Sequence, residues 1–535
     1  MSVLLDLKDL EQEDIARYRE LKIKIRKDLC FQPEVEKKSF GFDPGSAGAA
    51  SPPILFYTWD SAKRHLRVPF RYGVGLTKSF PNDKIERPRR PISFTGQLFD
   101  RQVPVAEEAM EHLKKQGATT IRVYPGFGKT ILAAYIAAQL GETVLVLAHR
   151  EILVEQWAGT FLSVTDADVW VVNRKLAPGE VPLVPKRRAD GSSGPPPPPE
   201  KKGKSQKGGK KKSAKKEEPE IAPSPEPVEM VVPNVLICMD QRWKWLTEEV
   251  RDSVGMLVID EAHTFCTPSR VETILSFRPK YVVAETATLE RTDGLHAMIQ
   301  SVCGTHGIIK ISEKPFHVTK LMTGVRPERR TTKQGKIDWA HLVRTTLMRE
   351  ERNELIYSIV QANPSFKILV LTSLVAHAKE LSKGLNERGV SADFMAGTKK
   401  KYRECACLCA STSKVGTGFD QNATNCIGYD GVRFNLVLMV CSFKKEALLE
   451  QCVGRAFRSD SPNVIHFVDE DNIYKSHWRV AEKWYRSRMG EISVEKISPA
   501  PEEAACEDFD DYQEEEEEEL EGEEVEVEGE GQSED

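Results

Sequence analysis

The stretch Thr119-Thr120-Ile121-Arg122-Val123-Tyr124-Pro125-Gly126-Phe127-Gly128-Lys129-Thr130 decides the fold of this 535-residue chain. Its first five residues favour a short strand, and an apolar, alanine-rich run continues from Thr130 to Leu140. The change from strand to helix pattern across a tight glycine-containing loop is typical of a strand–loop–helix unit in a parallel sheet. We therefore expect an α/β protein.

The loop within this stretch carries residue types that bind phosphate groups. Gly126 and Gly128 allow backbone N–H groups to approach a phosphate closely, and the start of the following helix adds partial positive charge. Lys129 is placed to reach the β- and γ-phosphates of ATP, and Thr130 to hold Mg²⁺. An ATP site is expected at Gly126, Phe127, Gly128, Lys129 and Thr130. Val123 stands where the full G-x-x-x-x-G-K-[ST] pattern has its first glycine, so a chance match is the alternative.

Strand and helix patterns alternate on both sides of this loop. The first series comprises helices at 104–115, 130–140 and 151–161 and strands at 119–123, 143–148, 235–239, 256–259 and 281–284. A second series begins near Phe366, with strands at 368–371, 407–410, 436–441 and 464–468 and helices at 375–388 and 445–455. Because such alternation is typical of parallel sheets covered by helices, the sequence predicts two α/β domains in tandem.

The predicted boundaries divide the chain into five parts. They are an N-terminal extension of unknown role at 1–94, a first α/β domain at 95–304, a linker at 305–345, a second α/β domain at 346–497 and an acidic, disordered tail at 498–535. One amphipathic helix is expected at Leu5–Leu29. Residues 175–230 contain PPPPP and KKGKSQKGGKKKSAKK, which cannot bury a core, so a disordered insertion is expected there.

Charge is distributed unevenly along the chain, although the formal net charge is only −5. Residues 502–535 hold 20 acidic residues and no Lys or Arg, whereas the other 501 residues hold 76 basic and 61 acidic residues. Residues 186–216 alone hold 12 basic residues and 2 acidic ones. This asymmetry indicates polyanion binding, with the tail as a competitor or as a docking site for a basic protein. The alternative is that both segments are solvated chain that maintains solubility.

Membrane and secreted classes are excluded by the sequence pattern. No uncharged apolar run reaches 18 residues, and the N-terminus MSVLLDLKDLEQED is acidic. The 11 cysteines are scattered, with none between Cys30 and Cys238, which favours reduced intracellular thiols over a disulfide framework. Cys405, Cys407 and Cys409 alternate, which favours buried thiols on one strand face over a metal site.

A second candidate site follows the apolar strand 256–259, where Asp260-Glu261-Ala262-His263 begins. An Asp at the carboxyl end of a parallel strand lies at the sheet edge where ligands bind and can hold Mg²⁺ through water. Glu261 is then placed to orient or deprotonate an attacking water. A charged turn that caps a helix is the alternative.

A third candidate lies in the second α/β domain, in the segment 451–458 (QCVGRAFR). Arg455 and Arg458 are three residues apart, so on a helix they project from one face. A cleft between the domains would let them reach the terminal phosphate held by the first domain, and hydrolysis would then depend on domain closure. The alternative, a solvated basic face, leaves Gly454 unexplained.

Together these segments resemble the motifs of superfamily 2 helicases, in that family's order, over about residues 95–490. YPGFGKT resembles motif I and DEAH is motif II; the other matching segments are LAHRE at 147–151 with Gln156 and Trp157, ETATLERTDG at 285–294, ILVLTS at 368–373, GTGFD at 416–420 and QCVGRAFR at 451–458. Leu289 stands where a proline is common. ATLxRxDG is closest to excision-repair-type and restriction-type DNA translocases. GFGKT and HREILVEQW most resemble the transcript-release DNA helicases of large DNA viruses.

The resemblance implies two RecA-like domains and a DEAH-box ATPase that uses ATP and Mg²⁺. It implies metal binding by Thr130 and Asp260, and catalytic roles for Lys129, Glu261, Arg455 and Arg458. It further implies nucleotide contacts from Gln102, which would read adenine, and from Gly418, Asp420 and Gln451; an exposed polar helix residue is the alternative for Gln102. Implied nucleic-acid contacts come from His149, Arg150, Thr286, Thr288, Ser373 and Thr417. Contact with the nucleic-acid backbone reads no sequence, so binding is expected to be sequence-tolerant and salt-sensitive.

The predicted function is an ATP-dependent helicase or translocase that acts on DNA in viral or cellular transcription, replication or repair. An RNA helicase and a duplex-DNA translocase that separates no strands are the alternatives within this class. A non-catalytic nucleic-acid-binding scaffold with a vestigial ATP site is the alternative of another class. The expected location is intracellular and soluble: the nucleus if the basic run is an import signal, or the cytoplasm or virion if the protein is viral.

Overall fold

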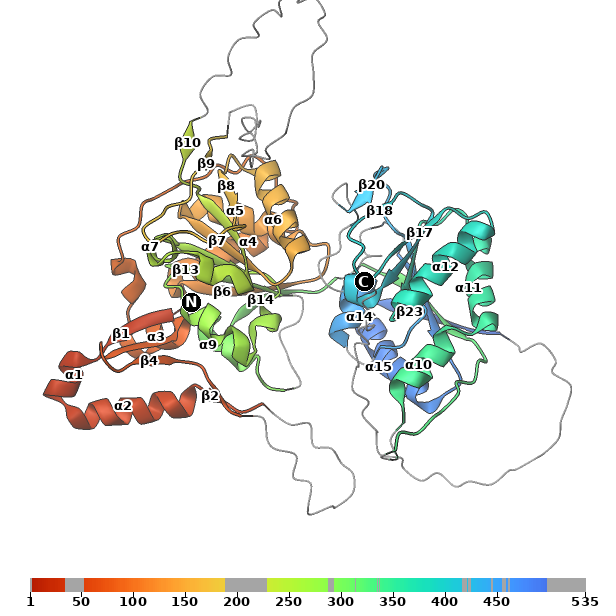
Figure 1. Ribbon diagram of the computed structural model, residues 1–535, viewed down its shortest axis with the longest axis horizontal. Coiled ribbons are helices and arrows are strands. Elements are labelled where there is room, and N and C mark those ends of the chain that lie inside the picture. The colour runs from red at the N-terminus through yellow and green to blue at the C-terminus, as the bar shows by residue number, and fades with distance from the viewer. Residues whose placement is uncertain are drawn as a thin grey trace, which may run out of the picture.

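The computed structural model describes residues 2–33, 52–187, 229–286, 293–312, 314–333, 335, 337–415, 421, 425–443, 446–454, 459 and 462–497. Two seven-stranded sheets occupy separate halves of the molecule (Figure 1). Every strand pairing within these two sheets is parallel. The predicted α/β class with two tandem RecA-like domains is confirmed.

The first sheet has the strand order β14-β6-β13-β12-β7-β11-β8. Its strands are β6 (Ala118–Val123), β7 (Val144–Ala148), β8 (Val169–Val171), β11 (Val235–Met239), β12 (Met256–Ile259), β13 (Tyr281–Thr286) and β14 (Gly307–Lys310). All five residues of β7 are buried, because helices cover both faces of a parallel sheet. Alternate residues of β7 enter two separate cores: Val144 and Val146 pack on one face, and Leu145 and Leu147 on the other.

Helices cover the two faces of this first sheet. Helices α4 (Val103–Gln116), α5 (Lys129–Leu140) and α6 (Glu151–Val164) build one core, and α7 (Glu248–Ser253), α8 (Val271–Leu275) and α9 (Ala297–Cys303) contribute to the other. Short 3₁₀ turns occupy η2 (Asp240–Trp245), η3 (Ala262–Phe265) and η4 (Pro268–Arg270). Each predicted strand and helix of this domain is confirmed within three residues.

The N-terminal residues pack on the first domain. β1 (Ser2–Asp6), β5 (His65–Pro69) and β4 (Thr58–Asp60) form an antiparallel sheet, accompanied by α1 (Lys8–Glu13), α2 (Ile15–Asp28), β2 (Cys30–Phe31), β3 (Ile54–Leu55), α3 (Phe70–Thr77) and η1 (Pro81–Lys84). The Ser2 hydroxyl donates a hydrogen bond to Leu275 O at 2.8 Å. The prediction of one helix over Leu5–Leu29 is wrong at its start, because Leu4 and Leu5 pair with β5 and Asp14 caps a new helix by accepting from Arg17 N.

The second sheet has the strand order β17-β19-β16-β21-β22-β15-β23. Its strands are β15 (Phe316–Met322), β16 (Ile368–Thr372), β17 (Ala392–Met395), β19 (Cys407–Ser411), β21 (Leu436–Met439), β22 (Asn463–Val468) and β23 (Gly490–Lys496). The helices around it are α10 (Trp339–Leu347), α11 (Glu350–Ala362), α12 (Val375–Glu387), α13 (Thr412–Val415), α14 (Glu446–Val453) and α15 (Asn472–Ser487). The four predicted strands of this domain lie within two residues of their predicted ends.

The crossing between the sheets differs from the predicted linker at 305–345. β14 joins the first sheet beside β6, and β15 joins the second sheet between β22 and β23. The chain therefore passes from one sheet to the other within residues 311–315. The linker prediction was wrong because β15 buries only Phe316, Val318 and Leu321 of its seven residues, and its partners β22 and β23 come much later in the chain.

Residues 188–228 of the predicted insertion and residues 498–535 of the predicted tail lie outside the described residues. These ranges contain most of the basic segment 186–216 and all of the acidic segment 502–535. The ends of the predicted insertion are ordered, because β9 (Val184–Pro185) pairs with β10 (Met230–Val231). None of the helices in the described part of the chain is long and apolar enough to cross a membrane.

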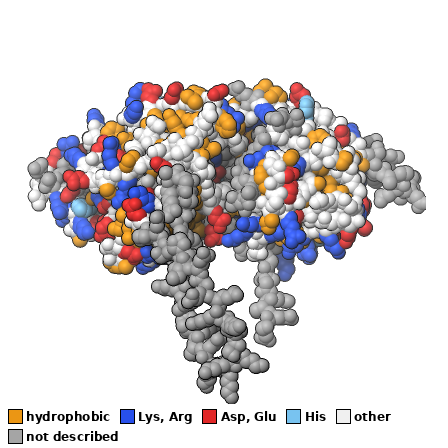
Figure 2. Space-filling view, turned by 90° about the horizontal axis from the view of Figure 1, so that it is seen from above, with side chains coloured by type: hydrophobic (Ala, Val, Ile, Leu, Met, Phe, Trp, Pro, Cys, Tyr) orange, Lys and Arg blue, Asp and Glu red, His pale blue; other side chains and the backbone are white. Residues whose placement is uncertain are grey.

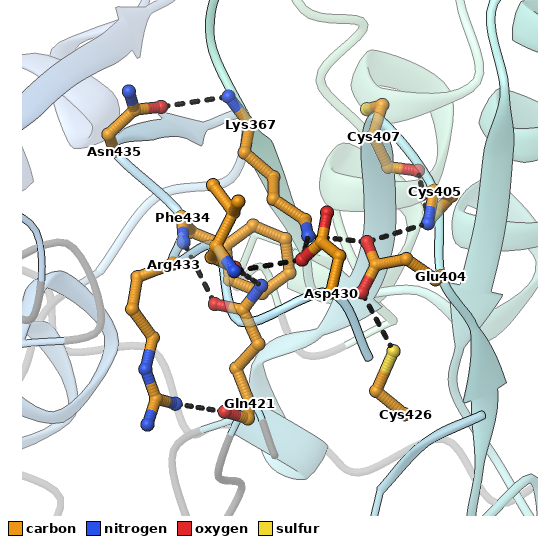
Figure 3. Close-up of polar contacts among 11 residues, drawn as sticks. Lys367, Glu404, Cys405, Cys407, Gln421, Cys426, Asp430, Arg433, Phe434 and Asn435 are labelled. Carbon is orange, nitrogen blue, oxygen red and sulfur yellow. Dashed lines mark hydrogen bonds and ion pairs between the residues drawn. The ribbon is translucent and has the colours of Figure 1, made fainter. Parts of the chain in front are cut away.

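A buried ion cluster stabilises the loops beside the second sheet (Figure 3). Lys367 Nζ, with only 8% of its side chain exposed, lies 2.5 Å from Glu404 Oε1 and 2.7 Å from Asp430 Oδ1. The Cys426 thiol lies 3.2 Å from Glu404 Oε2. Cys426 begins β20 (Cys426–Ile427), which pairs with β18 (Tyr402–Arg403). Cys405, Cys407 and Cys409 are buried, which confirms the predicted buried thiols.

Candidate nucleotide and nucleic-acid site

The loop between β6 and α5 has the backbone that the glycines predicted. Gly126 and Gly128 have φ of 86° and 95°, in the left-handed region that a side chain disfavours. A Cβ atom on Gly128 would also collide with Gln102 Nε2. Helix α5 begins at Lys129, so Lys129 and Thr130 occupy its first turn, where backbone N–H groups are unpaired. The phosphate-binding geometry follows from this loop and helix start.

Gln102 holds this loop from the start of α4. It is fully buried, and its Nε2 donates to Phe127 O at 3.0 Å and Gly128 O at 3.2 Å. Its Oε1 accepts a hydrogen bond from Phe99 N at 2.8 Å. The alternative of an exposed polar residue is therefore wrong. Phe127 has its side chain in the core, so only its backbone is available to a ligand.

The carboxylate predicted to be catalytic, Glu261, lies beside the loop lysine. Lys129 Nζ is 3.3 Å from Glu261 Oε1, and the two side chains are only 17% and 15% exposed. Glu261 has φ 48° and ψ 57°, a left-handed conformation that a non-glycine residue adopts only at a cost of about 1 kcal/mol or more. Burial by itself would raise the pKa of Glu261, but Lys129 and His263 outweigh it and the net pKa is lowered. Glu261 is therefore an ionised base at neutral pH.

Asp260 is the neighbouring carboxylate, at the end of β12 and 6% exposed. Trp157 Nε1 of α6 donates to Asp260 Oδ2 at 2.9 Å. Burial and then Glu261 raise the pKa of Asp260 to about 6, while Lys129 and Trp157 act in the opposite direction. Burial lowers the pKa of Lys129, but Glu261 and Asp260 raise it by more, so the net pKa is raised. The ammonium and the two carboxylates thus form one electrostatic unit.

His263 connects Glu261 to Thr286, which belongs to the segment that resembles motif III. His263 Nδ1 is 2.9 Å from Thr286 Oγ1 and 3.5 Å from Glu261 Oε2. Thr286 is fully buried, so the predicted nucleic-acid contact of its side chain is not met in this structure. Burial within β13 is the physical reason, because its neighbours β12 and β6 and the helices exclude it from the surface.

Glu285, next to Thr286, was missed by the sequence analysis. It is 0% exposed, and both of its carboxyl oxygens lack a hydrogen-bond partner among the described residues. Burial first, and then Asp260, raise its pKa to about 8. The signal available in the sequence was a glutamate that directly follows the apolar run Tyr281–Ala284.

The residues present fit a magnesium ion. Asp260 and Thr130 offer oxygen atoms at the end of β12 and the start of α5, and Glu285, whose carboxyl oxygens have no hydrogen-bond partner among the described residues, is on the strand next to β12. Across the described ranges, no three His, Cys, Asp or Glu side chains converge as a ready-made metal site. Mg²⁺ needs only one or two carboxylates from the protein, because waters and substrate phosphates occupy its other coordination positions.

The two domains contact each other beside this site. Gly454, which follows α14, lies against the phosphate-binding loop: a Cβ atom on Gly454 would be 2.6 Å from Pro125 Cβ. Only glycine permits this approach, which gives Gly454 the role that a solvated basic face left unexplained. Arg455 and Arg458 follow directly and lie outside the described residues.

A second contact joins the segment after β7 to the second domain. Arg150 Nη1 donates to Ser413 O at 3.1 Å, and Lys400 Nζ lies 2.7 Å from Glu151 Oε2. Ile152 packs against the core of the second domain. Burial, Arg150 and Lys400 together lower the pKa of Lys414, so three cations meet at this boundary.

The remaining predicted residues divide into three groups. Ser373 is exposed at the end of β16, and Gln451 is buried in α14. Burial lowers the pKa of His149 to about 4, so at neutral pH its ring carries no charge. Thr288, Thr417, Gly418 and Asp420 lie outside the described residues.

Comparison with known proteins gives consistent matches. Residues 95–291 match the family "Type III restriction enzyme, res subunit". The chain is 24% identical over 453 residues to "Putative helicase 161L" of Invertebrate iridescent virus 6, covering 80% of this chain and 90% of that protein. It is 26% identical over 432 residues to "Putative helicase 055L" of Frog virus 3, covering 78% and 84%.

Two further proteins are more distant. The chain is 21% identical over 459 residues to "Putative ATP-dependent RNA helicase L396" of Acanthamoeba polyphaga mimivirus, covering 81% of this chain and 77% of that protein. The structure of S. cerevisiae Dbp5 bound to RNA and ADP BeF3 aligns with 11% identity and a TM-score of 0.45 over 73% of this chain and 89% of that one. The predicted resemblance to helicases is confirmed, because residues 95–291 match the model of the type III restriction enzyme res subunit and the viral relatives are described as putative helicases.

Proposed function

We propose that this protein is a nucleic-acid-stimulated ATPase that moves along or separates DNA strands. The observation that carries the proposal is the pairing of Lys129 with Glu261 at 3.3 Å, between a phosphate-binding loop and the end of a parallel strand. Gly454 of the second domain lies against Pro125 of the same loop, which supports an ATPase whose site is completed by both domains.

The chain's own residues account for the steps at the phosphates. The backbone of Gly126–Gly128 and the start of α5 bind the phosphate chain, and Thr130 and Asp260 hold magnesium. Magnesium, when bound, neutralises charge on the β- and γ-phosphates. The terminal phosphate competes with Glu261 for the Lys129 ammonium. Once Lys129 turns to the phosphate, Glu261 is free to accept a proton from the attacking water.

The second domain would supply positive charge to the transition state. Arg455 and Arg458 follow Gly454, and an arginine so placed contributes roughly 10³–10⁵ in rate in related phosphoryl-transfer enzymes. Hydrolysis would then require the closed arrangement of the two domains. Opening after phosphate release would let one domain shift along the strand.

The proposed polymer is DNA. Lys and Arg side chains gather along the lower edge of the right-hand half in the space-filling view, the half that holds the second sheet (Figure 2). Arg150, Lys400 and Lys414 add a cationic group at the domain boundary. RNA is the second candidate, favoured by the similarity to a protein described as an ATP-dependent RNA helicase.

A nucleic-acid-stimulated ATPase panel tests this proposal. Turnover of the full-length chain is measured with duplex DNA, single-stranded DNA and RNA. We expect stimulation by DNA, and we expect Lys129→Ala and Glu261→Gln each to lower turnover by roughly 10²–10⁴-fold while polynucleotide binding persists. Lys115→Ala, an exposed lysine on α4, is the matched control and should retain turnover.

Three outcomes would change the assignment. Wild-type turnover in Lys129→Ala or Glu261→Gln would reject the catalytic roles. Stimulation by RNA alone would favour the RNA helicase. Turnover near zero with every polynucleotide, together with intact binding, would favour the scaffold with a vestigial ATP site.

A further inference from the structure

Glu285 is a buried carboxyl group that the steps above do not use. It lies in β13 with 0% of its surface exposed, and neither Oε1 nor Oε2 has a hydrogen-bond partner among the described residues. An ionisable group without a partner in the interior is costly, about 1–3 kcal/mol even for a neutral polar group. Such a group in a functional site indicates a ligand that comes and goes.

The register of the sheet places Glu285 beside Asp260. Ile259, the last paired residue of β12, is opposite Ala284 of β13. Asp260 and Glu285 are the next residues on these adjacent parallel strands. Residues in register on neighbouring parallel strands point to the same face of the sheet. The two carboxyl groups therefore share one face at the carboxyl edge of the sheet, where ligands bind.

Three carboxyl groups surround the Lys129 ammonium, and Glu285 is the one that forms no hydrogen bond with it or with another described residue. Asp260, Glu261 and Glu285 contribute three carboxyl groups, and Lys129 is the ammonium that interacts with all three. Asp260 and Glu261 both raise the pKa of Glu285, and Lys129 lowers it. Lys129 forms its ion pair with Glu261, which leaves the oxygens of Glu285 without a hydrogen bond. A divalent cation between the two strand ends would favour the ionised form of Glu285, and the waters on the cation would supply the hydrogen bonds that its oxygens lack.

Direct coordination by Glu285 is not what the geometry favours. The described residues contain no preformed cluster of three acidic, histidine or cysteine ligands. Mg²⁺ keeps several of its waters, and each bound water has protons that need an acceptor. We propose that Glu285 is a positioning residue for magnesium, whose carboxyl accepts hydrogen bonds from waters on the ion that Asp260 and Thr130 hold. This inference rests on the proposed ATP–magnesium function.

The test measures metal affinity without turnover. The full-length chain is loaded with ADP, and Mn²⁺ is titrated as the spectroscopic probe, with free ion followed by electron paramagnetic resonance. Glu285→Leu, of similar size but unable to accept a hydrogen bond, should weaken Mn²⁺ binding roughly 10-fold or more. Glu285→Gln keeps one acceptor oxygen and should lie between wild type and Glu285→Leu. ADP affinity in EDTA should be unchanged in both variants.

Glu142→Gln is the matched control. Glu142 is another buried glutamate of the first domain, 5% exposed, and it precedes β7 at the opposite end of the sheet. Its substitution should leave Mn²⁺ affinity at the wild-type value. Thermal unfolding without metal checks the fold, and Glu285→Gln, an isosteric change, remains informative if Glu285→Leu unfolds early.

The outcomes separate this inference from the proposed function. Wild-type Mn²⁺ affinity in Glu285→Gln and Glu285→Leu, with a large loss in Asp260→Asn, would overturn the role of Glu285 and leave the ATPase proposal intact. A wild-type chain that binds neither ADP nor Mn²⁺–ADP would reject the proposed function itself. An equal loss in Glu142→Gln would show a general packing effect and would also overturn the role.

Discussion

Trp157 links helix α6 to Asp260, the carboxylate proposed to hold magnesium. Its Nε1 donates to Asp260 Oδ2 at 2.9 Å, and the ring is 2% exposed. A hydrogen bond to a charged group is worth about 1.5–3 kcal/mol, and its loss leaves Asp260 less satisfied. Trp157 thus couples the stability of the first domain to the geometry of its site.

We predict that Trp157→Phe lowers the free energy of unfolding by about 1.5–3 kcal/mol more than Trp170→Phe. Trp170 is a buried tryptophan on β8, so its substitution measures the loss of ring surface alone. Urea denaturation followed by circular dichroism provides the comparison. Equal losses in the two variants would mean that the hydrogen bond to Asp260 contributes nothing.

Lys129, Thr130, Asp260 and Glu261 could be identified from the sequence because each belongs to a local pattern whose chemistry is carried by neighbouring residues. Trp157 and Glu285 were part of motif-like segments, but their individual roles could not be predicted, because these roles depend on a contact across 103 residues and on strand register. Gln102 was identified by resemblance, but its bonds to Phe127 and Gly128 depend on how α4 packs against the loop. Residue types therefore predicted the chemistry of the site, whereas the hydrogen-bond partners of these side chains depend on how the chain folds.

At the scale of elements, the segment after β7 and helix α13 bring cations from two domains together. Arg150 bonds to Ser413 O, and Lys414 lies close enough to Arg150 and Lys400 for both to lower its pKa, after burial. Like charges gather at a cost unless a polyanion neutralises them. Lys400 and Lys414 were not among the predicted contacts, because nothing in the local sequence indicates that they face Arg150.

We predict that Lys414→Ala weakens binding to single-stranded and duplex DNA and reduces the salt dependence of binding. Each lost phosphate contact should lower the slope of log K against log salt concentration by about 0.7–0.9. Fluorescence anisotropy over a salt series measures the slope. Lys383→Ala, an exposed lysine on α12 with a 79% exposed side chain, is the control. Identical slopes for the two variants would contradict a phosphate contact at Lys414.

The crossing between the sheets is a lesson at the same scale. Residues 305–345 read as a linker because Pro, Lys and Arg interrupt the apolar pattern. In the structure β14 lies at the edge of its sheet beside β6, and β15 lies between β22 and β23, so both pair with strands far away in the sequence. A central strand such as β7 is apolar throughout and is found from its sequence, whereas β15 buries only three of its seven residues and needs its partners to be recognised.

At the scale of the whole molecule, the two domains should respond differently to acid. In the second domain, His377 is fully buried between Thr372 and Asn353, with Nδ1 2.8 Å from Thr372 Oγ1 and Nε2 2.9 Å from Asn353 Oδ1. His466 is 3% exposed and lies 2.9 Å from the Tyr485 hydroxyl. Burial lowers the pKa of each to about 3. Both rings are therefore neutral in the folded domain.

The sign of the effect follows from proton binding. Below about pH 6.5 the unfolded chain binds protons on these histidines and the folded chain does not. The free energy of unfolding therefore decreases as the pH is lowered. In the first domain the buried acids act in the opposite direction. Glu285, raised to about 8, and Asp260, raised to about 6, hold protons in the folded state that the unfolded chain releases. They offset the loss expected there from His149.

We predict that the second domain loses about 2 kcal/mol of stability for each of the two histidines between pH 7 and pH 5. Urea unfolding followed by tryptophan fluorescence should show this loss, because Trp478 and Trp484 lie in the core of that domain. His377→Gln removes one titrating group and should halve the change with pH. His317→Gln, whose side chain is 70% exposed on β15, should leave it unchanged. If His377→Gln lost as much stability as wild type over this range, the buried histidines would not set the acid limit, and the Arg352–Asp469 pair would be the next group to test.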